Sequence, residues 1–329
     1  RAARAAGLVR DERPAHPLAL DPPHDPEGVR GPFGQRLRVW LVPRLWLLGR
    51  NKQSRIFQDM TVEDIAREVL GQHHLELRFT AVRKLARRAY AVQYEESDLR
   101  FLRRLFAEEG LFFTFEHTDD DGLVVCDSAE LCKPIAGDPV LSFRETAGMT
   151  EHDDHVRELR PRDQVKPGSV LLRDFDFHRP SFEVAARAET PPEQDAFDSR
   201  SIGIHDHHGD FGRAGIEPRI AQIRLDQERR RARVTTGESR CFRLAPGAWF
   251  EVRGAAHVEG DGRFTVVRIE HEGHTPEAGG ESREVYENRF WCVPAEIAPL
   301  PKKPRRRVRQ VLETATVVGP AGQDIHTDA

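Results

Sequence analysis

Residues 93–116 read QYEESDLRFLRRLFAEEGLFFTFE and contain, one directly after the other, the signals of a helix and of a strand. Ser97 carries a hydroxyl that can cap a helix, and Asp98 places a negative charge at the positive helix end. Gly110 is a residue type at which helices commonly end. Between these ends, apolar side chains recur at helical spacing and predict one buried face, made of Leu99, Leu102, Leu105 and Phe106.

The segments around this helix predict the rest of a compact unit. Residues 111–128 have the pattern of two strands joined by the turn DDDG, which is typical of a β-hairpin. Upstream, Thr61 can cap a second helix, Asp64 is placed to complete a capping box, and Gly71 can end it. We therefore predict an α+β domain at residues 59–155, with the hairpin packed on the helices.

The N-terminal region has a different composition. Residues 1–35 are rich in Pro and Arg and have no apolar period, so we expect an irregular segment. LRVWLVPRLWLLG at residues 37–49 is apolar and aromatic, and Pro43 divides it. This pattern predicts two short strands, or one strand and a bend.

The second half of the chain predicts mainly β-structure. A strand is expected at 168–177, an irregular segment at 189–217 and a polar helix at 217–232. Short strands separated by turn residues follow at regular spacing, which is typical of a barrel or sandwich; we place them at 241–244, 249–254, 263–273 and 283–294. Pro, Arg and Lys residues at 299–312 predict an extended linker.

Composition excludes several classes of protein. The net charge is -4, from 50 basic and 54 acidic residues, whereas general nucleic-acid binders have a basic excess. No run of eighteen apolar residues is present, and the first residues lack the apolar core of a signal peptide. The cysteines are too scattered for a disulfide framework and fit a reducing compartment; they are Cys126, Cys132, Cys241 and Cys292.

Two histidine-rich stretches contain residue types that bind metals. One runs from His205 to Asp210 and includes Asp206, His207 and His208; the other is HDDH at 152–155. Neither has the helical H-x-x-x-H or the C-x-x-C spacing that presets a metal site. We interpret both as solvated polar segments, and a metal site in the first remains the alternative.

Acidic residues near the first helix could be mistaken for a catalytic pair. Glu95, Glu96 and Asp98 lie at its start, and Glu108 and Glu109 at its end, so capping and solvation explain them without acid–base chemistry. No G-x-S-x-G, P-loop or dinucleotide-binding glycine pattern is present. We predict no catalytic residue, no cofactor and no metal, and we interpret the basic run at 302–309 as part of the linker.

Seven segments, taken together and in order, resemble one known family. They are SRIFQDMTVEDIAREVL, YAVQYEESDLRFLRRLFAEEGLFFTFEH, SVLLRDFDFHRPSFEV, GESRCFRLAPGAWFEV, RIEHEG, YENRFWCVPAEI and VVGPAGQDIHTD. This order is similar to that of VgrG proteins, the spike proteins of bacterial type VI secretion, which resemble the tail hubs of contractile phages (the late control gene D family). The resemblance spans residues 36–328.

The resemblance implies a β-rich α+β fold in which tube-forming barrels carry an inserted α+β unit. Residues 36–58 would form part of a first tube barrel, and residues 156–298 a second one with an insert at about 187–233. Residues 313–329 would begin a truncated domain resembling an oligonucleotide/oligosaccharide-binding (OB) barrel. The family has a fuller first barrel than residues 1–35 supply, and it continues beyond residue 329.

The function that the resemblance implies is structural. VgrG-like hubs are homotrimers that dock on the hexameric tube protein Hcp, carry a PAAR tip and effectors, and cross membranes only by mechanical puncture. They assemble in the cytoplasm, are then translocated, and have no enzyme activity of their own. Two alternatives remain open: a tail hub of a phage or phage-like particle, and a metal-dependent effector enzyme using His205–Asp210.

Overall fold

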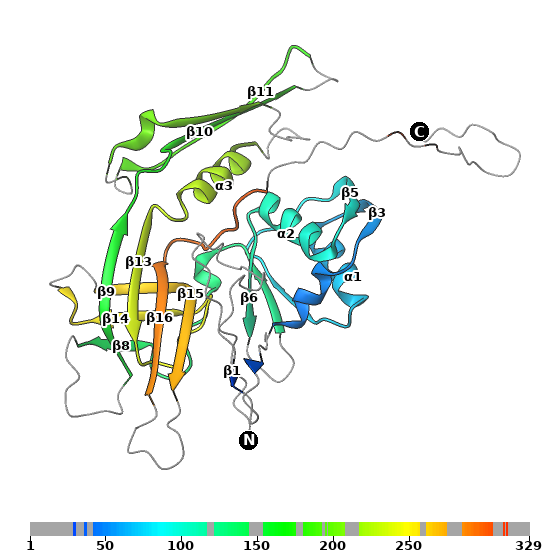
Figure 1. Ribbon diagram of the computed structural model, residues 1–329. Coiled ribbons are helices and arrows are strands. Elements are labelled where there is room, and N and C mark those ends of the chain that lie inside the picture. The colour runs from blue at the N-terminus through cyan, green and yellow to red at the C-terminus, as the bar shows by residue number, and fades with distance from the viewer. Residues whose placement is uncertain are drawn as a thin grey trace, which may run out of the picture.

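A computed structural model gives the arrangement of the chain (Figure 1). It describes residues 29–30, 36–37, 42–116, 122–144, 154–175, 180–192, 195, 197–207, 217–256, 261–274, 285–304, 312 and 314. The acidic turn of the predicted hairpin, most of the irregular segment at 1–35 and nearly all of 313–329 lie outside these residues. Val29–Arg30 (β1) and Arg36–Leu37 (β2) form a short antiparallel pair, so the described part of the segment predicted as irregular is a strand.

An α+β unit begins at β3, ahead of the predicted start at residue 59. Its strands are β3 (Gln53–Met60), β4 (Leu77–Thr80), β5 (Arg88–Glu96), β6 (Phe112–Glu116) and β7 (Gly122–Cys126), and its helices are α1 (Val62–Gly71) and α2 (Asp98–Glu109). β3 pairs with β5, while β7 lies between β4 and β6. The predicted hairpin is confirmed, since β6 and β7 are antiparallel from Phe112 opposite Cys126 to Glu116 opposite Gly122.

Both helices begin as their sequences predict. Thr61 and Asp64 form a complete capping box at α1, and the Ser97 hydroxyl accepts a hydrogen bond from the Arg100 backbone at α2. The predicted apolar stripe of α2 is buried, and Phe101 joins it by stacking on Phe57 with 5.5 Å between ring centroids. This burial of aromatic and aliphatic side chains makes the core of the unit.

The two helices end differently. Gly110 follows α2 in the left-handed conformation, with φ of 66°, as predicted. Gly71 is instead the last helical residue of α1, and Gln72 closes that helix with ordinary helical angles. The prediction that α1 ends at Gly71 is therefore confirmed.

Six strands close into a barrel, in the order β13–β16–β15–β14–β8–β9. Their bounds are β8 (Val140–Phe143), β9 (His155–Asp163), β13 (Arg233–Ser239), β14 (Trp249–Arg253), β15 (Gly262–His274) and β16 (Val285–Pro294). The rings of Phe250 and Phe290 meet edge to face inside it, with centroids 5.4 Å apart. The interior is thus a packed hydrophobic core.

Between β9 and β13 the chain leaves the barrel and forms a separate layer. β10 (Ser169–Phe175) lies between the antiparallel β11 (Glu183–Glu189) and the parallel β12 (Gly203–His207). Helix α3 (Glu217–Arg229) covers one face of this sheet with Ala221 and Leu225. Figure 1 shows α3 between this sheet and the barrel, with the α+β unit beside the helix.

Several sequence predictions need correction. Residues 44–49 form a 3-10 helix (η1), because Leu45 and Leu48 lie three positions apart and pack into the core beside α2. Residues 241–244 are a turn after β13, in which the Leu244 backbone donates to Cys241. Part of the segment predicted as irregular at 189–217 is strand β12, because its backbone pairs with β10. Short 3-10 turns occur at Ala129–Leu131 (η2) and Ser199–Ser201 (η4).

Strand pairing also moves the expected boundaries. β10 was expected in the second barrel, but its hydrogen bonds go to β11 and β12, so the excursion from the barrel begins near residue 164 rather than 187. β8 was expected in the α+β region, yet it pairs with β14 and β9 in the barrel. β3 belongs with β5 in the α+β unit rather than in a preceding barrel.

Candidate functional site

A buried carboxylate fixes the start of α2. Asp98 is 1% exposed and accepts hydrogen bonds from Gln93 at 2.8 Å and Asn51 at 2.5 Å. Arg55 forms an ion pair with Oδ1, and His73 Nε2 lies 3.0 Å from Oδ2. Burial acts to raise the pKa of Asp98, but the hydrogen bonds from Gln93 and the other partners outweigh it and hold the pKa below its usual value.

This network corrects the interpretation of Asp98 as a solvated helix-end charge. It joins the loop before β3, both paired strands β3 and β5, and the end of α1 to the first turn of α2. Its members Asn51, Arg55 and His73 are separated from Asp98 by 25 to 47 residues, so no local spacing points to it. The arrangement holds the unit together and leaves no carboxylate oxygen without a partner for acid–base chemistry.

A second charged network fixes the end of α2. Arg88 Nη1 lies 2.7 Å from Glu108, and Arg88 Nη2 lies 2.9 Å from Glu109. Arg83 also pairs with Glu109, and Glu109 is 8% exposed. Desolvation acts against the Arg88 cation, but the two glutamates dominate and raise its pKa. The two acids were expected on a wet surface; instead they anchor α2 to the adjoining strand and loop.

The same end of α2 meets α3. Arg219 of α3 lies 3.4 Å from Glu109, and Gln227 Nε2 donates to the Ala107 carbonyl at 2.7 Å. A Cβ at Gly110 would lie 2.8 Å from the Ile223 side chain. Gly110 is thus required both for its left-handed backbone and for the close approach of the two helices.

The α+β unit also packs directly on the barrel. Ile135 and Trp249 are joined by their backbones, with Ile135 N donating to Trp249 O at 3.0 Å and Trp249 N to Lys133 O at 2.9 Å. A small apolar cluster covers this junction and includes Phe112, Cys126, Cys132 and Leu300. Leu300 comes from the segment predicted as a linker, so this part of the segment is anchored against the barrel and the α+β unit.

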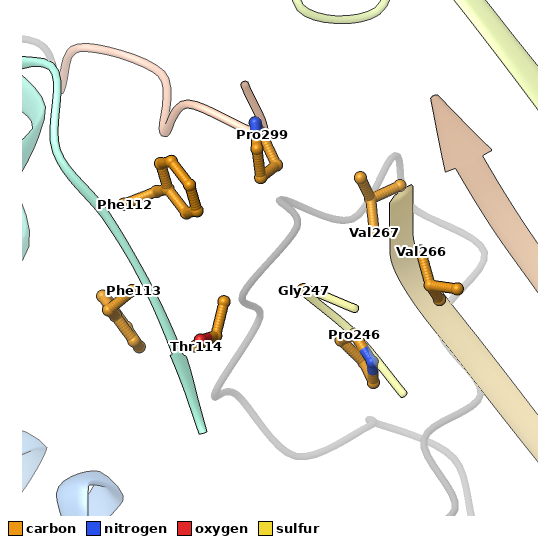
Figure 2. A pocket seen from close by; sticks show the side chains of 8 residues that line it. All are labelled: Phe112, Phe113, Thr114, Pro246, Gly247, Val266, Val267 and Pro299. Carbon is orange, nitrogen blue, oxygen red and sulfur yellow. The ribbon is translucent and has the colours of Figure 1, made fainter. Parts of the chain in front are cut away.

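A pocket lies at this junction (Figure 2). It encloses about 230 Å³ of space that is partly open to solvent, and its lining is apolar apart from Thr114; the residues are Phe112, Phe113, Thr114, Pro246, Gly247, Val266, Val267 and Pro299. Ligand sites commonly hold several convergent polar groups, whereas Thr114 supplies the one polar side chain of this lining. This pocket therefore has the character of a packing seam between two domains.

The structure separates the predicted metal-ligand candidates. His205 and His207 point to one exposed face of β12 and Asp206 to the other, because side chains alternate along a strand. His208 and Asp210 lie outside the described residues, as do His152 and Asp153. His155 is buried at the start of β9, and Asp154 pairs with Arg243 at 2.7 Å. Within the part of the chain that the structure describes, no three His, Cys, Asp or Glu side chains are grouped around a metal position.

The cysteines are buried and carry no disulfide. Burial raises the pKa of the Cys126 thiol to about 11 and of the Cys132 thiol to about 12. Because the thiolate is the reactive form, these groups are poor nucleophiles at neutral pH. No helix among the described residues is long and apolar enough to cross a membrane.

Comparison with known proteins gives the context of this arrangement. The chain is 30% identical over 334 residues to the type VI secretion system spike protein VgrG2a of Pseudomonas aeruginosa, covering 98% of this chain and 39% of that protein. It is 29% identical over 320 residues to VgrG4b of the same organism, covering 91% of this chain and 39% of that spike protein. The chain thus spans about two fifths of these relatives.

A further relative has a different name. The actin cross-linking toxin VgrG1 of Vibrio cholerae is 30% identical over 305 residues, covering 88% of this chain and 27% of the toxin. Among solved structures, the Escherichia coli c3393 protein, described as a type VI secretion component similar to T4 tail proteins gp27 and gp5, matches with a TM-score of 0.55. That match has 18% identity and covers 82% of this chain and 59% of the other, so it supports the fold.

A family model for the phage tail baseplate hub (GPD) matches residues 25–277, which include the α+β unit, the excursion sheet with α3 and most of the barrel. This match covers well over half of the 329 residues. The chain therefore belongs to the phage tail baseplate hub (GPD) family.

Proposed function

We propose that this chain is the hub region of a type VI secretion spike and that its role is mechanical. The observation that carries the proposal is the family match over residues 25–277, together with similarity to VgrG spike proteins across nearly the whole chain. The charged networks at both ends of α2 support it. They hold the α+β unit together and join it to α3 through Glu109 and Arg219, as expected for a part that transmits force.

The proposal includes an assembly. Three copies would form the hub, the closed barrel would be a tube-forming domain, and the ring would dock on an Hcp-type tube protein. The remaining parts of a spike would carry the PAAR tip and effectors to a target membrane after cytoplasmic assembly. An extended linker that ends at residue 312 and an OB-like domain from residue 313 belong to this proposal.

Sedimentation velocity on the purified chain, followed by capture of tagged Hcp-type tube protein, tests this proposal. We expect a three-subunit species that retains the tube protein. A species that remains monomeric at micromolar concentration and retains no tube protein would contradict it. Asp98→Asn serves as a folding-sensitive control, because loss of assembly in that variant should accompany loss of thermal stability.

A tail hub of a phage-like particle is the second candidate, since the family model is described for phage tail baseplate hubs. The neighbouring genes distinguish the two. Sheath, tube and ATPase genes support secretion, whereas capsid genes support a phage particle.

We propose no enzyme activity for these 329 residues. The metal-dependent alternative requires His205–Asp210 to bind a metal, and elemental analysis of the purified chain tests it. Stoichiometric zinc that disappears in the His205→Ala/His207→Ala double variant would overturn the mechanical proposal for this segment. We expect no stoichiometric metal in either protein.

A further inference from the structure

A row of polar side chains crosses the inner wall of the barrel where β13 ends. Asn288 of β16 lies opposite Ser239 of β13 on one side and opposite His271 of β15 on the other. Asn288 comes two residues before the core residue Phe290, so both side chains face the barrel interior. Ser239 is fully buried and Asn288 is 3% exposed. Figure 1 shows the three strands side by side, and we refer to Ser239, Asn288 and His271 as the polar row.

The hydrogen bonds of Asn288 fix the orientation of its side-chain amide. The amide nitrogen donates to the Cys241 carbonyl at 2.9 Å and to the Tyr286 hydroxyl at 3.1 Å. The amide oxygen accepts from the Ser239 hydroxyl at 2.8 Å. That hydroxyl in turn accepts from the Cys241 backbone N–H at 3.2 Å. Because the Cys241 carbonyl can only accept, the amide cannot be turned around without losing these bonds.

This orientation decides which proton joins Tyr286 to His271. Since Asn288 already donates to the Tyr286 oxygen, the hydroxyl proton of Tyr286 is directed to His271 Nδ1, 2.6 Å away. Nδ1 must then be an acceptor, which requires a neutral imidazole with its proton on Nε2. The two rings also lie against each other, with centroids 5.9 Å apart. Burial raises the pKa of Tyr286, so the hydroxyl keeps the proton that it donates.

A second proton on His271 would break this contact. Both ring nitrogens of an imidazolium are donors, so an N–H at Nδ1 would face the Tyr286 hydroxyl. The hydroxyl would then need another acceptor for its own proton, and in the described part of the chain its partners are His271 and Asn288 alone. His271 is partly exposed, so a proton from solvent reaches its ring. Histidine is the side chain that ordinarily changes charge between about pH 5 and 8.

The polar row holds the turn at residues 241–244, which follows β13. Both backbone polar groups of Cys241 bond to the row, the N–H to Ser239 and the carbonyl to Asn288. Cys241 is fully buried, whereas the next residue, Phe242, is 71% exposed. A change in the hydrogen bonds of the row is therefore felt at the start of a turn that presents an aromatic side chain to solvent.

We propose that the contact between His271 and Tyr286 is a pH switch: it holds the turn at residues 241–244 in place near neutral pH and releases the turn when His271 takes up a proton. The sign follows from linkage, because proton uptake breaks this hydrogen bond only in the closed form and so favours the open turn. The switch goes beyond the hub role and does not depend on tube binding.

Other titratable or charged groups lie around the switch. They are Tyr286 and Glu287 on β16, Glu270 and Glu272 on β15, Arg240, Cys241 and Arg243 at the turn, and Asp154 and His155 at the start of β9. Burial raises the pKa of Cys241, and Asp154 pairs with Arg243 at 2.7 Å. His155 is a second histidine at the turn, since its carbonyl accepts from the Arg240 backbone N–H. His271 is the histidine whose ring nitrogen bonds to Tyr286, and the experiment below separates the two.

Hydrogen exchange of the full chain, followed by mass spectrometry at about pH 7.5 and about pH 5.5, tests the switch on both sides of histidine titration. Labelling times are corrected for the intrinsic exchange rate at each pH. In the parent chain, the protection of peptides covering residues 239–244 should fall by about five- to tenfold at the lower pH, as expected for the loss of one hydrogen bond. Peptides covering β10 should keep their protection, which also shows that each chain tested is folded.

Two variants separate the proton sensor from the contact that it breaks. His271→Gln keeps a side-chain acceptor but cannot take up a proton, so the turn should stay protected at both pH values. Tyr286→Phe lacks the hydroxyl, so the turn should be poorly protected at both pH values. His205→Gln is the matched control: His205 lies on the exposed face of β12, and its loss should leave the response of the parent chain unchanged.

Three results would overturn the proposal. One is equal protection of the turn at both pH values in the parent chain. Another is the same loss of protection in His271→Gln as in the parent chain, which would assign the pH response to another group such as His155. The third is a Tyr286→Phe variant that follows the parent chain at both pH values, which would show that the hydroxyl does not hold the turn.

Discussion

Helices α2 and α3 have 12 and 13 residues, but different contacts hold them in place. α2 buries a continuous apolar stripe that includes Phe101, Leu102 and Leu105. α3 is polar, buries Ala221 and Leu225 on its sheet, and is fastened to α2 through side-chain contacts. The first helix is positioned by its own sequence pattern, and the second by partners far away in the chain.

The largest expected effect comes from removing a buried apolar side chain of α2. Phe101→Ala should lower the free energy of unfolding by about 3–5 kcal/mol, because it leaves a cavity beside Phe57. Leu225→Ala in α3 should cost less, about 2 kcal/mol, because it removes a smaller side chain than Phe101→Ala does. Chemical denaturation measures both. If Leu225→Ala were the more costly change, the contrast between the two helices would be wrong.

The next largest effect comes from removing the buried charge at the start of α2. Asp98→Asn should cost about 2–3 kcal/mol at neutral pH, because Arg55 loses its buried partner. Glu95→Gln is the control: Glu95 lies in an exposed pair with Lys52, and its loss should be close to neutral.

Asp98→Asn also tests how the stability of the chain depends on pH. The folded-state pKa of Asp98 is lowered, so its contribution is fully present above the unfolded value of about 4 and is lost as the pH falls through the folded pKa. The free energy of unfolding, measured from pH 7 down to pH 2, should therefore fall less steeply below about pH 4 in Asp98→Asn than in the parent chain. Identical slopes would show that Asp98 is not an important source of acid sensitivity.

A smaller effect tests the contact between the two helices. Gly110→Ala should cost about 1–2 kcal/mol for the left-handed backbone alone, and more if Ile223 does not move. Gly71→Ala is a matched control, because Gly71 is helical and has no neighbour within 4 Å of an added Cβ. That change should stabilise the chain by about 0.5–1 kcal/mol. In thermal melting, we expect Gly110→Ala to lower the melting temperature and Gly71→Ala to raise it.

The smallest effect concerns the charged outer side of α2. Glu108→Gln should cost about 0.5–1 kcal/mol, since the pair with Arg88 is partly exposed. Melting and sedimentation together measure stability and assembly. A large loss of assembly at unchanged stability would mean that Glu108 contacts another subunit instead of serving only to anchor α2.

How far the sequence predicts the molecule depends on the range of the interactions. Thr61, Ser97 and Gly110 carry local signals, and the caps and the helix end that they predict are confirmed. The 3-10 helix at Arg44–Gly49 was missed because apolar, aromatic residues also favour strands, and only packing beside α2 separates the two.

Strand pairing and the charged networks could not be predicted from local sequence patterns. Whether β10 pairs within the barrel or with β12 depends on backbone contacts that leave no spacing in the sequence. Glu109 meets Arg219 across 110 positions, and Gln227 meets Ala107 across 120. The resemblance to a known family supplied the architecture, but it did not supply these contacts.

Electron microscopy of the chain mixed with an Hcp-type tube protein tests the hub proposal most directly. The account predicts three copies of the chain forming a ring at the end of a tube, with the closed barrels lining it and the α+β units joined to them. Single copies that never associate with the tube, under conditions in which the chain is folded, would contradict it.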